Sequence, residues 1–134
     1  MTVRVLIADD SSLQRSGWRM VLESQPDLEI VGEAGDGARV LAIVRREPTD
    51  VVLMDVHMPR VNGLVASERI LTDAAVRELG APPRIVLATA LELDDHLAEA
   101  ARAGVFAVIH KDTDPESLFD IVRAAASAVD GRAD

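Results

Sequence analysis

The chain has 134 residues, of which 49% are hydrophobic, so it is the size of one domain and can bury a core. Its net charge of −9, from 23 acidic and 14 basic residues, argues against nucleic acid as the main partner, because duplex binding uses a basic surface. The lack of cysteine excludes disulfides and thiolate zinc sites, and no apolar run reaches the ~18 residues of a membrane span, so we expect a soluble, cytoplasmic protein.

Strand patterns and helix patterns alternate along the chain. Short apolar runs bounded by turn residues predict strands at residues 3–8, 28–34, 51–54, 84–88 and 105–109. Apolar residues at a spacing of three or four predict helices between Ser11 and Pro26, between Gly37 and Pro48, from Leu64 to Leu79, from Asp94 or Asp95 to Gly104, and from Pro115 to Val129. Five strands alternating with five helices predict an α/β fold with a parallel sheet and helices on both faces, because parallel neighbours need crossover connections.

Polar and charged residues stand at the carboxyl ends of four of the predicted strands. Asp9 and Asp10 follow the first strand, Asp55 the third, Thr89 the fourth and Lys111 the fifth. In an open parallel sheet the ligand site lies outside these strand ends, where the strand order reverses. We therefore expect the five side chains to meet at one edge of the sheet.

The chemistry of this set predicts a magnesium site that handles a phosphoryl group. Three neighbouring carboxylates repel one another unless a cation compensates them, and oxygen ligands suit Mg²⁺, which keeps several waters and binds phosphoryl groups. The Lys111 ammonium can pair with a carboxylate or a phosphoryl oxygen, and the Thr89 hydroxyl can donate to the same oxygen.

Asp55 is the expected nucleophile. A carboxylate can form an aspartyl phosphate, and phosphoryl transfer depends mainly on positioning and charge neutralisation. Asp55 stands alone after its strand, whereas Asp9 and Asp10 together can hold the metal. His57-Met58-Pro59 and Asn62-Gly63 follow it, so a loop rich in turn residues separates Asp55 from the next helix.

Each piece also has an ordinary structural explanation. An Asp pair is often a helix cap, a lone lysine is usually solvated, and a threonine after a strand is often a turn residue, so only the combination carries the prediction. Two other kinds of site are disfavoured. A dinucleotide site is disfavoured because the glycines at 32, 35 and 37 do not have the order G-x-G-x-x-G. A histidine metal site is disfavoured because His57, His96 and His110 lie on different predicted elements. His57 is either a side chain that controls water near the acidic site or a surface histidine.

The same residues resemble the receiver domains of the response regulators of two-component systems. The resemblance spans residues 3 to about 130 and rests on Asp9-Asp10, Asp55-Val56-His57-Met58-Pro59 with Asn62-Gly63, Thr89-Ala90 and Lys111. The segment 32–37 and the pair Lys111-Asp112 resemble the NarL/LuxR-type subfamily, whose members usually carry a C-terminal helix-turn-helix. The resemblance implies a flavodoxin-like, doubly wound sheet of five parallel strands in the order 2-1-3-4-5, with five helices.

The resemblance also implies a phosphorylation-dependent switch in a phosphorelay. Asp55 would accept a phosphoryl group from a sensor histidine kinase, and Mg²⁺ would be held by Asp9, Asp10, Asp55 and the main-chain carbonyl of His57. Thr89 and Lys111 would sense the phosphoryl group and change the surface of the fourth helix, fifth strand and fifth helix, through which a homodimer can form. Self-phosphorylation and autodephosphorylation are the only enzymatic activities that it implies.

Residues 1–130 are expected to form the receiver domain, and residues 131–134 a tail or the start of a linker. The chain ends where this subfamily usually carries a DNA-binding domain. We therefore expect either a stand-alone receiver or one separated from an output domain that controls transcription. DNA contact would be made only through that output domain.

Two sequence features depart from the family pattern. The usual switch aromatic of the fifth strand falls at Val108, and Phe106, two positions earlier, is not an obvious substitute. The region before the fourth strand is a few residues longer than is common in this subfamily, and residues 72–75 either extend the third helix or add a loop. The absence of the aromatic at Val108 predicts an altered output.

Two other classes of function stay open. One is a phosphatase with an aspartyl nucleophile, similar to haloacid dehalogenases, although that family usually places D-x-D on its first strand and here Asp55 lies on the third. The other is a receiver-like binding module that is never phosphorylated. The intact set of Asp55, Thr89 and Lys111 argues against the passive module, and Val108 argues for it.

Overall fold

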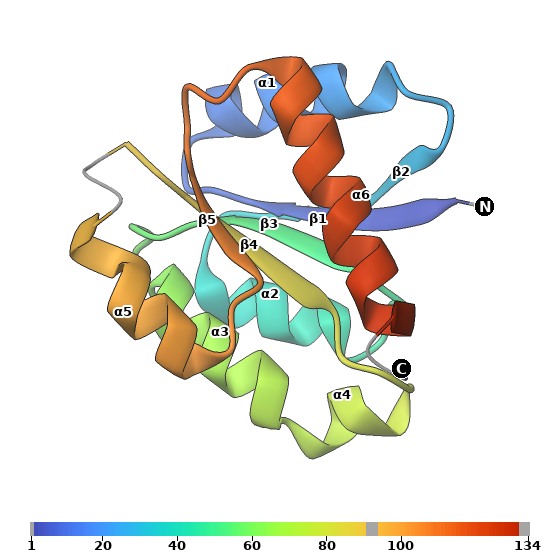
Figure 1. Ribbon diagram of the computed structural model, residues 1–134. Helices are drawn as coiled ribbons and strands as arrows, with labels where there is room; N and C mark the ends of the chain where they lie inside the picture. Colours follow the sequence, from blue (N-terminus) through green and yellow to red (C-terminus); the bar gives the residue numbers. More distant parts are fainter. Residues whose placement is uncertain (1, 91–93, 132–134) are drawn as a thin grey trace.

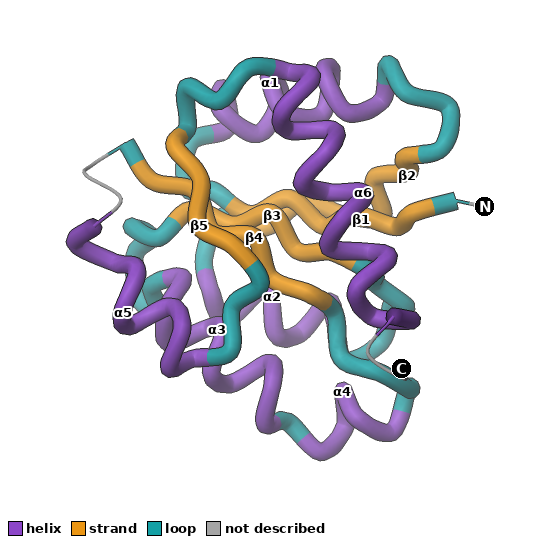
Figure 2. The backbone as a smooth tube through the Cα atoms, in the orientation of Figure 1, coloured by secondary structure: helices purple, strands orange, loops and turns teal. Residues whose placement is uncertain are grey.

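The computed structural model describes residues 2–90 and 94–131. Their strands form one parallel sheet with the order β2-β1-β3-β4-β5 (Figures 1 and 2). The strands are β1 (Val3–Ala8), β2 (Leu28–Ala34), β3 (Val51–Asp55), β4 (Arg84–Thr89) and β5 (Ala107–His110). The predicted α/β class and strand order are therefore confirmed. β5 begins two residues later than predicted, because the Val105 N–H still donates to the Ala100 carbonyl at the end of the preceding helix.

The helices cover both faces of the sheet, as expected for a doubly wound fold (Figure 1). Two helices lie on one face, α1 (Ser12–Glu23) and α6 (Pro115–Gly131). The other face carries α2 (Gly37–Val44), α3 (Gly63–Thr72), α4 (Ala74–Glu78) and α5 (Asp94–Ala103). Within the described part of the chain, no helix combines the length and the apolar character that crossing a membrane requires.

Each face of the sheet has its own hydrophobic core. Side chains alternate between the two faces along a strand, so Leu6 packs on the α2–α5 side while Val5 and Ile7 pack on the α1–α6 side. The central strands are buried on both sides, which explains their unbroken apolar sequences. Trp18 of α1 is buried in the second core, which confirms that it serves packing.

The single helix predicted from Leu64 to Leu79 is wrong, because the segment forms two helices, and of the two alternatives for residues 72–75 the interruption rather than the extension is found. Asp73 has an extended backbone, with φ −76° and ψ 127°, and ends α3. Its carboxylate accepts the N–H of Val76 at 3.0 Å and so caps α4, while Arg45 of the α2 C-terminus pairs with it at 2.7 Å. The cap and the ion pair stabilise a break where the pattern of apolar residues alone predicted continuation. The described chain has six helices rather than five.

The end of the sheet opposite the predicted site is tied by Arg4 and Asp50. The Asp50 carboxylate accepts the main-chain N–H of Arg4 at 2.8 Å and both Nε and one terminal nitrogen of its guanidinium at 3.1 Å. The N–H of Asp50 donates to the Arg4 carbonyl, and the Asp50 carbonyl accepts from Arg84 of β4. Asp50 therefore joins the starts of β1, β3 and β4.

At the other end of the chain, α6 continues through Gly131. The first residue of the predicted tail is therefore helical, and the rest of that tail, residues 132–134, lies outside the described residues.

Candidate functional site

The predicted site residues all lie at the carboxyl edge of the sheet. Asp9 and Asp10 follow β1 directly, Asp55 is the last residue of β3, Thr89 is the last residue of β4, and Lys111 follows β5. The parallel arrangement of the strands brings these residues together although 102 positions separate Asp9 from Lys111. The edge coincides with the reversal of strand order between β1 and β3, as the topology rule predicts.

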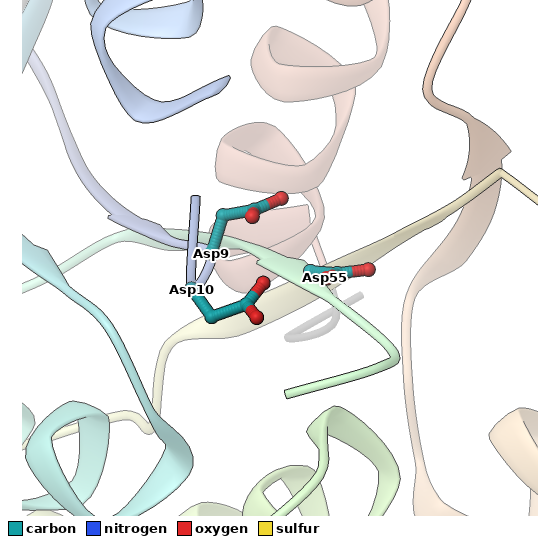
Figure 3. Close-up of side chains that lie close together, drawn as sticks. All are labelled: Asp9, Asp10 and Asp55. Atoms are coloured by element: carbon teal, nitrogen blue, oxygen red, sulfur yellow. The ribbon is translucent and has the colours of Figure 1, made fainter. Parts of the chain in front are cut away.

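Three carboxylates form the centre of this edge (Figure 3). One oxygen from each of Asp9, Asp10 and Asp55 lies within 4.8 Å of the others. Asp9 and Asp55 are buried, with 0% and 3% of their surface exposed, whereas Asp10 is exposed. The Asp9 carboxylate also accepts the N–H of Ser11 at 2.8 Å, which fixes it at the start of α1.

Lys111 places its ammonium between the two buried carboxylates. Its Nζ lies 2.7 Å from Oδ2 of Asp9 and 3.3 Å from Oδ2 of Asp55. The main-chain N–H of Lys111 donates to the Thr89 carbonyl at 2.9 Å, which extends the pairing of β4 and β5 past the end of the sheet. The lysine is thus held by both its backbone and its side chain.

The buried setting shifts the pKa values of Asp55 and Lys111. Burial raises the pKa of Asp55, and the nearby Asp9 charge raises it further, while Lys111 offsets part of the effect. For Lys111, burial opposes the charged form, but the hydrogen bond to Asp9 and the charge of Asp55 outweigh it and raise the pKa of the ammonium. Lys111 therefore stays charged at neutral pH and compensates only part of the negative charge beside it.

The donor set fits a hard divalent cation. All three side chains offer carboxylate oxygens, and the exposure of Asp10 leaves the cluster open to the waters that Mg²⁺ keeps. A second positive charge would relieve the repulsion that raises the pKa of Asp55. These residues are the ones that would hold such an ion.

Thr89 and His57 lie beside this cluster. Thr89 is fully buried at the end of β4, next to Ala88, which pairs with Asp55 across the sheet. The main-chain N–H of His57 donates to Oδ1 of Asp55 at 3.2 Å, and its side chain is exposed. The backbone of His57 is therefore held at the acidic cluster, while the catalytic and ligand roles of both residues stay predictions.

The loop after Asp55, residues 56–62, turns back sharply against the end of β3. The N–H of Gly63 donates to the Val56 carbonyl at 2.9 Å. A Cβ atom at Gly63 would lie 2.4 Å from the Asp55 carbonyl oxygen, so no larger residue fits without a shift of the backbone. The first turn of α3, capped by Asn62, therefore begins in contact with the strand that carries Asp55.

Arg15 of α1 is a site residue that the sequence did not indicate. Its guanidinium donates to the main-chain carbonyl of Asp9 and also pairs with Glu33 of β2 at 3.1 Å. Its one usable signal is its position, one turn into the helix that follows Asp9-Asp10. That position does not reveal the direction of a long side chain, because an arginine there is usually solvated.

The two residues considered for the switch aromatic pack on opposite faces. Val108 of β5 packs against the core on the α2–α5 side, and Phe106 packs against the core on the α1–α6 side. Phe106 therefore does not occupy the place of the missing aromatic, which agrees with the sequence-based expectation.

The fold and the acidic edge together define a receiver, the domain of two-component systems that works as a phosphorylation switch. The family model described as response regulator receiver domain matches residues 5–123, and the chain belongs to this family. Within it, the chain is a receiver of the NarL/LuxR type.

The relatives support this placement. The chain is 40% identical over 124 residues to the uncharacterized transcriptional regulatory protein YxjL of Bacillus subtilis, and 36% identical over 123 residues to the nitrate/nitrite response regulator protein NarP of Escherichia coli. Each match covers 92% of this chain and 54% of the relative, so the chain spans about half the length of these relatives. The solved receiver domain of NarL from Mycobacterium tuberculosis is 30% identical, with a TM-score of 0.78 and coverage of 97% of this chain and 98% of that one.

Proposed function

We propose that this chain is the phosphorylation-dependent switch of a two-component response regulator, with Asp55 as the phosphoryl acceptor. The observation that carries the proposal is the position of Asp55, which is buried at the switch point of the sheet, within 4.8 Å of two further carboxylates and 3.3 Å from Lys111. Asp9 shares these neighbours, but it follows β1 instead of ending it, and its oxygens are held more closely, by the N–H of Ser11 at 2.8 Å and by Lys111 at 2.7 Å.

The residues around Asp55 have distinct parts in this proposal. Asp9, Asp10, Asp55 and the His57 main-chain carbonyl would hold Mg²⁺, which, when bound, neutralises charge on the transferring phosphoryl group. Lys111, already within reach of Asp55, contacts a phosphoryl oxygen after transfer, and the Thr89 hydroxyl donates to another. The N–H of His57 and the ammonium of Lys111 keep the reacting carboxylate of Asp55 oriented.

The phosphoryl donor in this proposal is the phosphohistidine of a sensor kinase. The output is a change in the surface formed by α5, β5 and α6. These elements are the fourth helix, the fifth strand and the fifth helix of the sequence-based prediction. A homodimer through that surface is one form of output. Since YxjL is named a transcriptional regulatory protein, a further domain that binds DNA is the proposed effector.

Phosphorylation with a small donor tests the proposal. With Mg²⁺ and acetyl phosphate, intact-mass measurement should find one added phosphoryl group on the wild-type chain and none on Asp55→Asn. Asp112→Asn, at a side chain that is 92% exposed, is the matched control and should accept the group normally. A wild-type chain that never gains the adduct would reject the switch, whereas rapid turnover of phosphate monoesters would favour the aspartyl phosphatase.

The role of Lys111 is tested by the rate of the same reaction. Lys111→Ala removes the cation that faces Asp55, and loss of one group that stabilises developing charge slows such steps by about 100-fold. We therefore expect the phosphorylated form to accumulate much more slowly in this variant at saturating Mg²⁺. An unchanged rate would remove Lys111 from the reaction and leave it a structural partner of Asp9.

A further inference from the structure

The loop between β3 and α3 contains one strained residue, Arg60. Its φ is +66°, and among the described residues no other non-glycine residue has a positive φ. The N–H of Val61 donates to the Pro59 carbonyl at 2.8 Å, which closes a γ-turn around Arg60. Such a conformation is unfavourable for a residue with a side chain and persists only where the surroundings hold it.

The turn between β2 and α2 supplies that hold. One guanidinium nitrogen of Arg60 donates to Oδ2 of Asp36 at 2.9 Å, and the N–H of Gly37 donates to the Val61 carbonyl at 3.2 Å. Asp36 is only 4% exposed, and its other oxygen accepts the N–H of Arg39 at 3.0 Å, so the carboxylate is fixed as the cap of α2. It is therefore a rigid anchor for the more exposed Arg60.

The two segments also touch through their backbones. A Cβ atom at Gly37 would lie 2.4 Å from the Val61 carbonyl oxygen, so glycine is needed for this approach. The ends of the loop are fixed separately, by the N–H of His57 on Asp55 and by the N–H of Gly63 on the Val56 carbonyl. The ion pair between Asp36 and Arg60 thus controls the middle of a loop whose start lies at the acidic cluster.

We propose that Asp36 and Arg60 are positioning residues that set the affinity of the acidic site for a divalent cation. They hold the γ-turn and, through the backbone of Met58 and Pro59, the orientation of His57, whose N–H donates to Asp55 and whose main-chain carbonyl would face the cation. Neither side chain contacts the cation. The inference rests on the proposed function, which assigns that carbonyl to the cation.

Two substitutions at one position separate the ion pair from the turn. Arg60→Ala removes the ion pair and leaves a side chain that disfavours the turn, so Mg²⁺ should bind about tenfold more weakly, as is typical when a partner that orients a metal ligand is lost. Arg60→Gly lacks the ion pair too, but glycine accepts a positive φ freely, so its affinity should stay within about twofold of wild type. Titration calorimetry of the unphosphorylated chain with Mg²⁺ measures both.

Arg39→Ala is the charge control. Arg39 lies 3.9 Å from the same Asp36 oxygen and is as exposed as Arg60, but it stands on α2 rather than on the loop. Loss of a positive charge alone would make Mg²⁺ bind slightly tighter in every arginine variant. If Arg60→Ala binds Mg²⁺ as tightly as Arg39→Ala does, the inference is overturned.

Amide exchange gives a second measurement that does not depend on the cation. The N–H of Val61, which closes the γ-turn, should exchange faster in Arg60→Ala than in wild type and recover its protection in Arg60→Gly. Equal protection in all three proteins would contradict the inference. A wild-type chain that binds no Mg²⁺ would instead reject the proposed function, and this inference would fall with it.

Discussion

Asp55 is an acid in an environment that disfavours its charge. Burial and the neighbouring Asp9 raise its pKa, and Lys111 compensates only in part. A carboxyl whose pKa is higher in the folded than in the unfolded protein lowers stability at every pH where the unfolded form is ionised. The residue best placed for chemistry is therefore one that weakens the resting fold.

Replacing this carboxylate should stabilise the protein. In EDTA at pH 7, Asp55→Asn should raise the free energy of unfolding by about 1 kcal/mol, because the amide carries no charge to desolvate. The gain should shrink as the pH falls through the raised folded pKa of Asp55 and should disappear below about 4, where the unfolded carboxyl is protonated as well. Urea denaturation followed by circular dichroism measures the difference, and Asp112→Asn should change stability by no more than about 0.5 kcal/mol.

Mg²⁺ should narrow this difference in stability between the wild type and Asp55→Asn. At a concentration of about ten times its Kd, the cation should add about 1.4 kcal/mol to the wild type, and it should add less to Asp55→Asn, which lacks one ligand. A variant that is less stable than the wild type in EDTA, or that gains as much from Mg²⁺, would contradict this account of Asp55.

At the scale of elements, Asp73 separates two helices that the apolar pattern joins. Its carboxylate caps α4 and pairs with Arg45, and the pairing lowers the pKa of Asp73, with the Arg45 hydrogen bond as the largest cause. Asp73→Ala should lower Tm by about 4 °C, because the N-cap and the ion pair are both lost.

The variant Asp73→Asn distinguishes the two contributions, since asparagine caps helices as well as aspartate does but carries no charge. It should recover most of the loss measured by thermal denaturation for Asp73→Ala. If asparagine were no better than alanine, the ion pair with Arg45 rather than the cap would maintain the break between α3 and α4.

The elements differ in how well the sequence predicts them. The three central strands were predictable because both of their faces are buried, which gives apolar runs such as residues 3–8, whereas the edge strands β2 and β5 are only partly buried. The acidic cluster followed from strand ends and parallel topology alone. The helix break at Asp73, the Arg15 contact to Asp9 and the Asp36–Arg60 pair were not predictable, because each depends on where one polar side chain points in the assembled fold.

At the scale of the whole molecule, the two ends of the sheet contribute to stability with opposite signs. The carboxyl end collects unfavourable charge, whereas at the amino end Arg4 and Asp50 join the starts of three strands. Burial alone would raise the pKa of Asp50, but the hydrogen bonds and charge of Arg4 outweigh it and hold that pKa below the usual range. This group therefore stabilises the fold where the unfolded carboxyl is ionised.

The contribution of Asp50 should disappear in acid. Asp50→Asn should lower the free energy of unfolding at pH 7 by about 1 kcal/mol, a modest figure because Arg4 is partly exposed and screened. Since the folded pKa is lowered, the stabilisation is fully present above the unfolded pKa of about 4 and is lost as the pH falls through the folded value. Urea denaturation across this range should find the two proteins converging, and a difference independent of pH would assign the effect to packing.

Asp50 and Asp55 stand at opposite ends of β3. Asp50 precedes the strand and Asp55 closes it, so at ~3.3 Å per residue they lie roughly 16 Å apart. That separation exceeds both the screening length in physiological salt, about 8 Å, and the range of about 10 Å over which substitutions usually couple. The effects of Asp50→Asn and Asp55→Asn should therefore be additive. Substitutions at Asp50 can thus change the stability of the fold during evolution while the chemistry proposed for Asp55, at the other end of the same strand, stays unchanged.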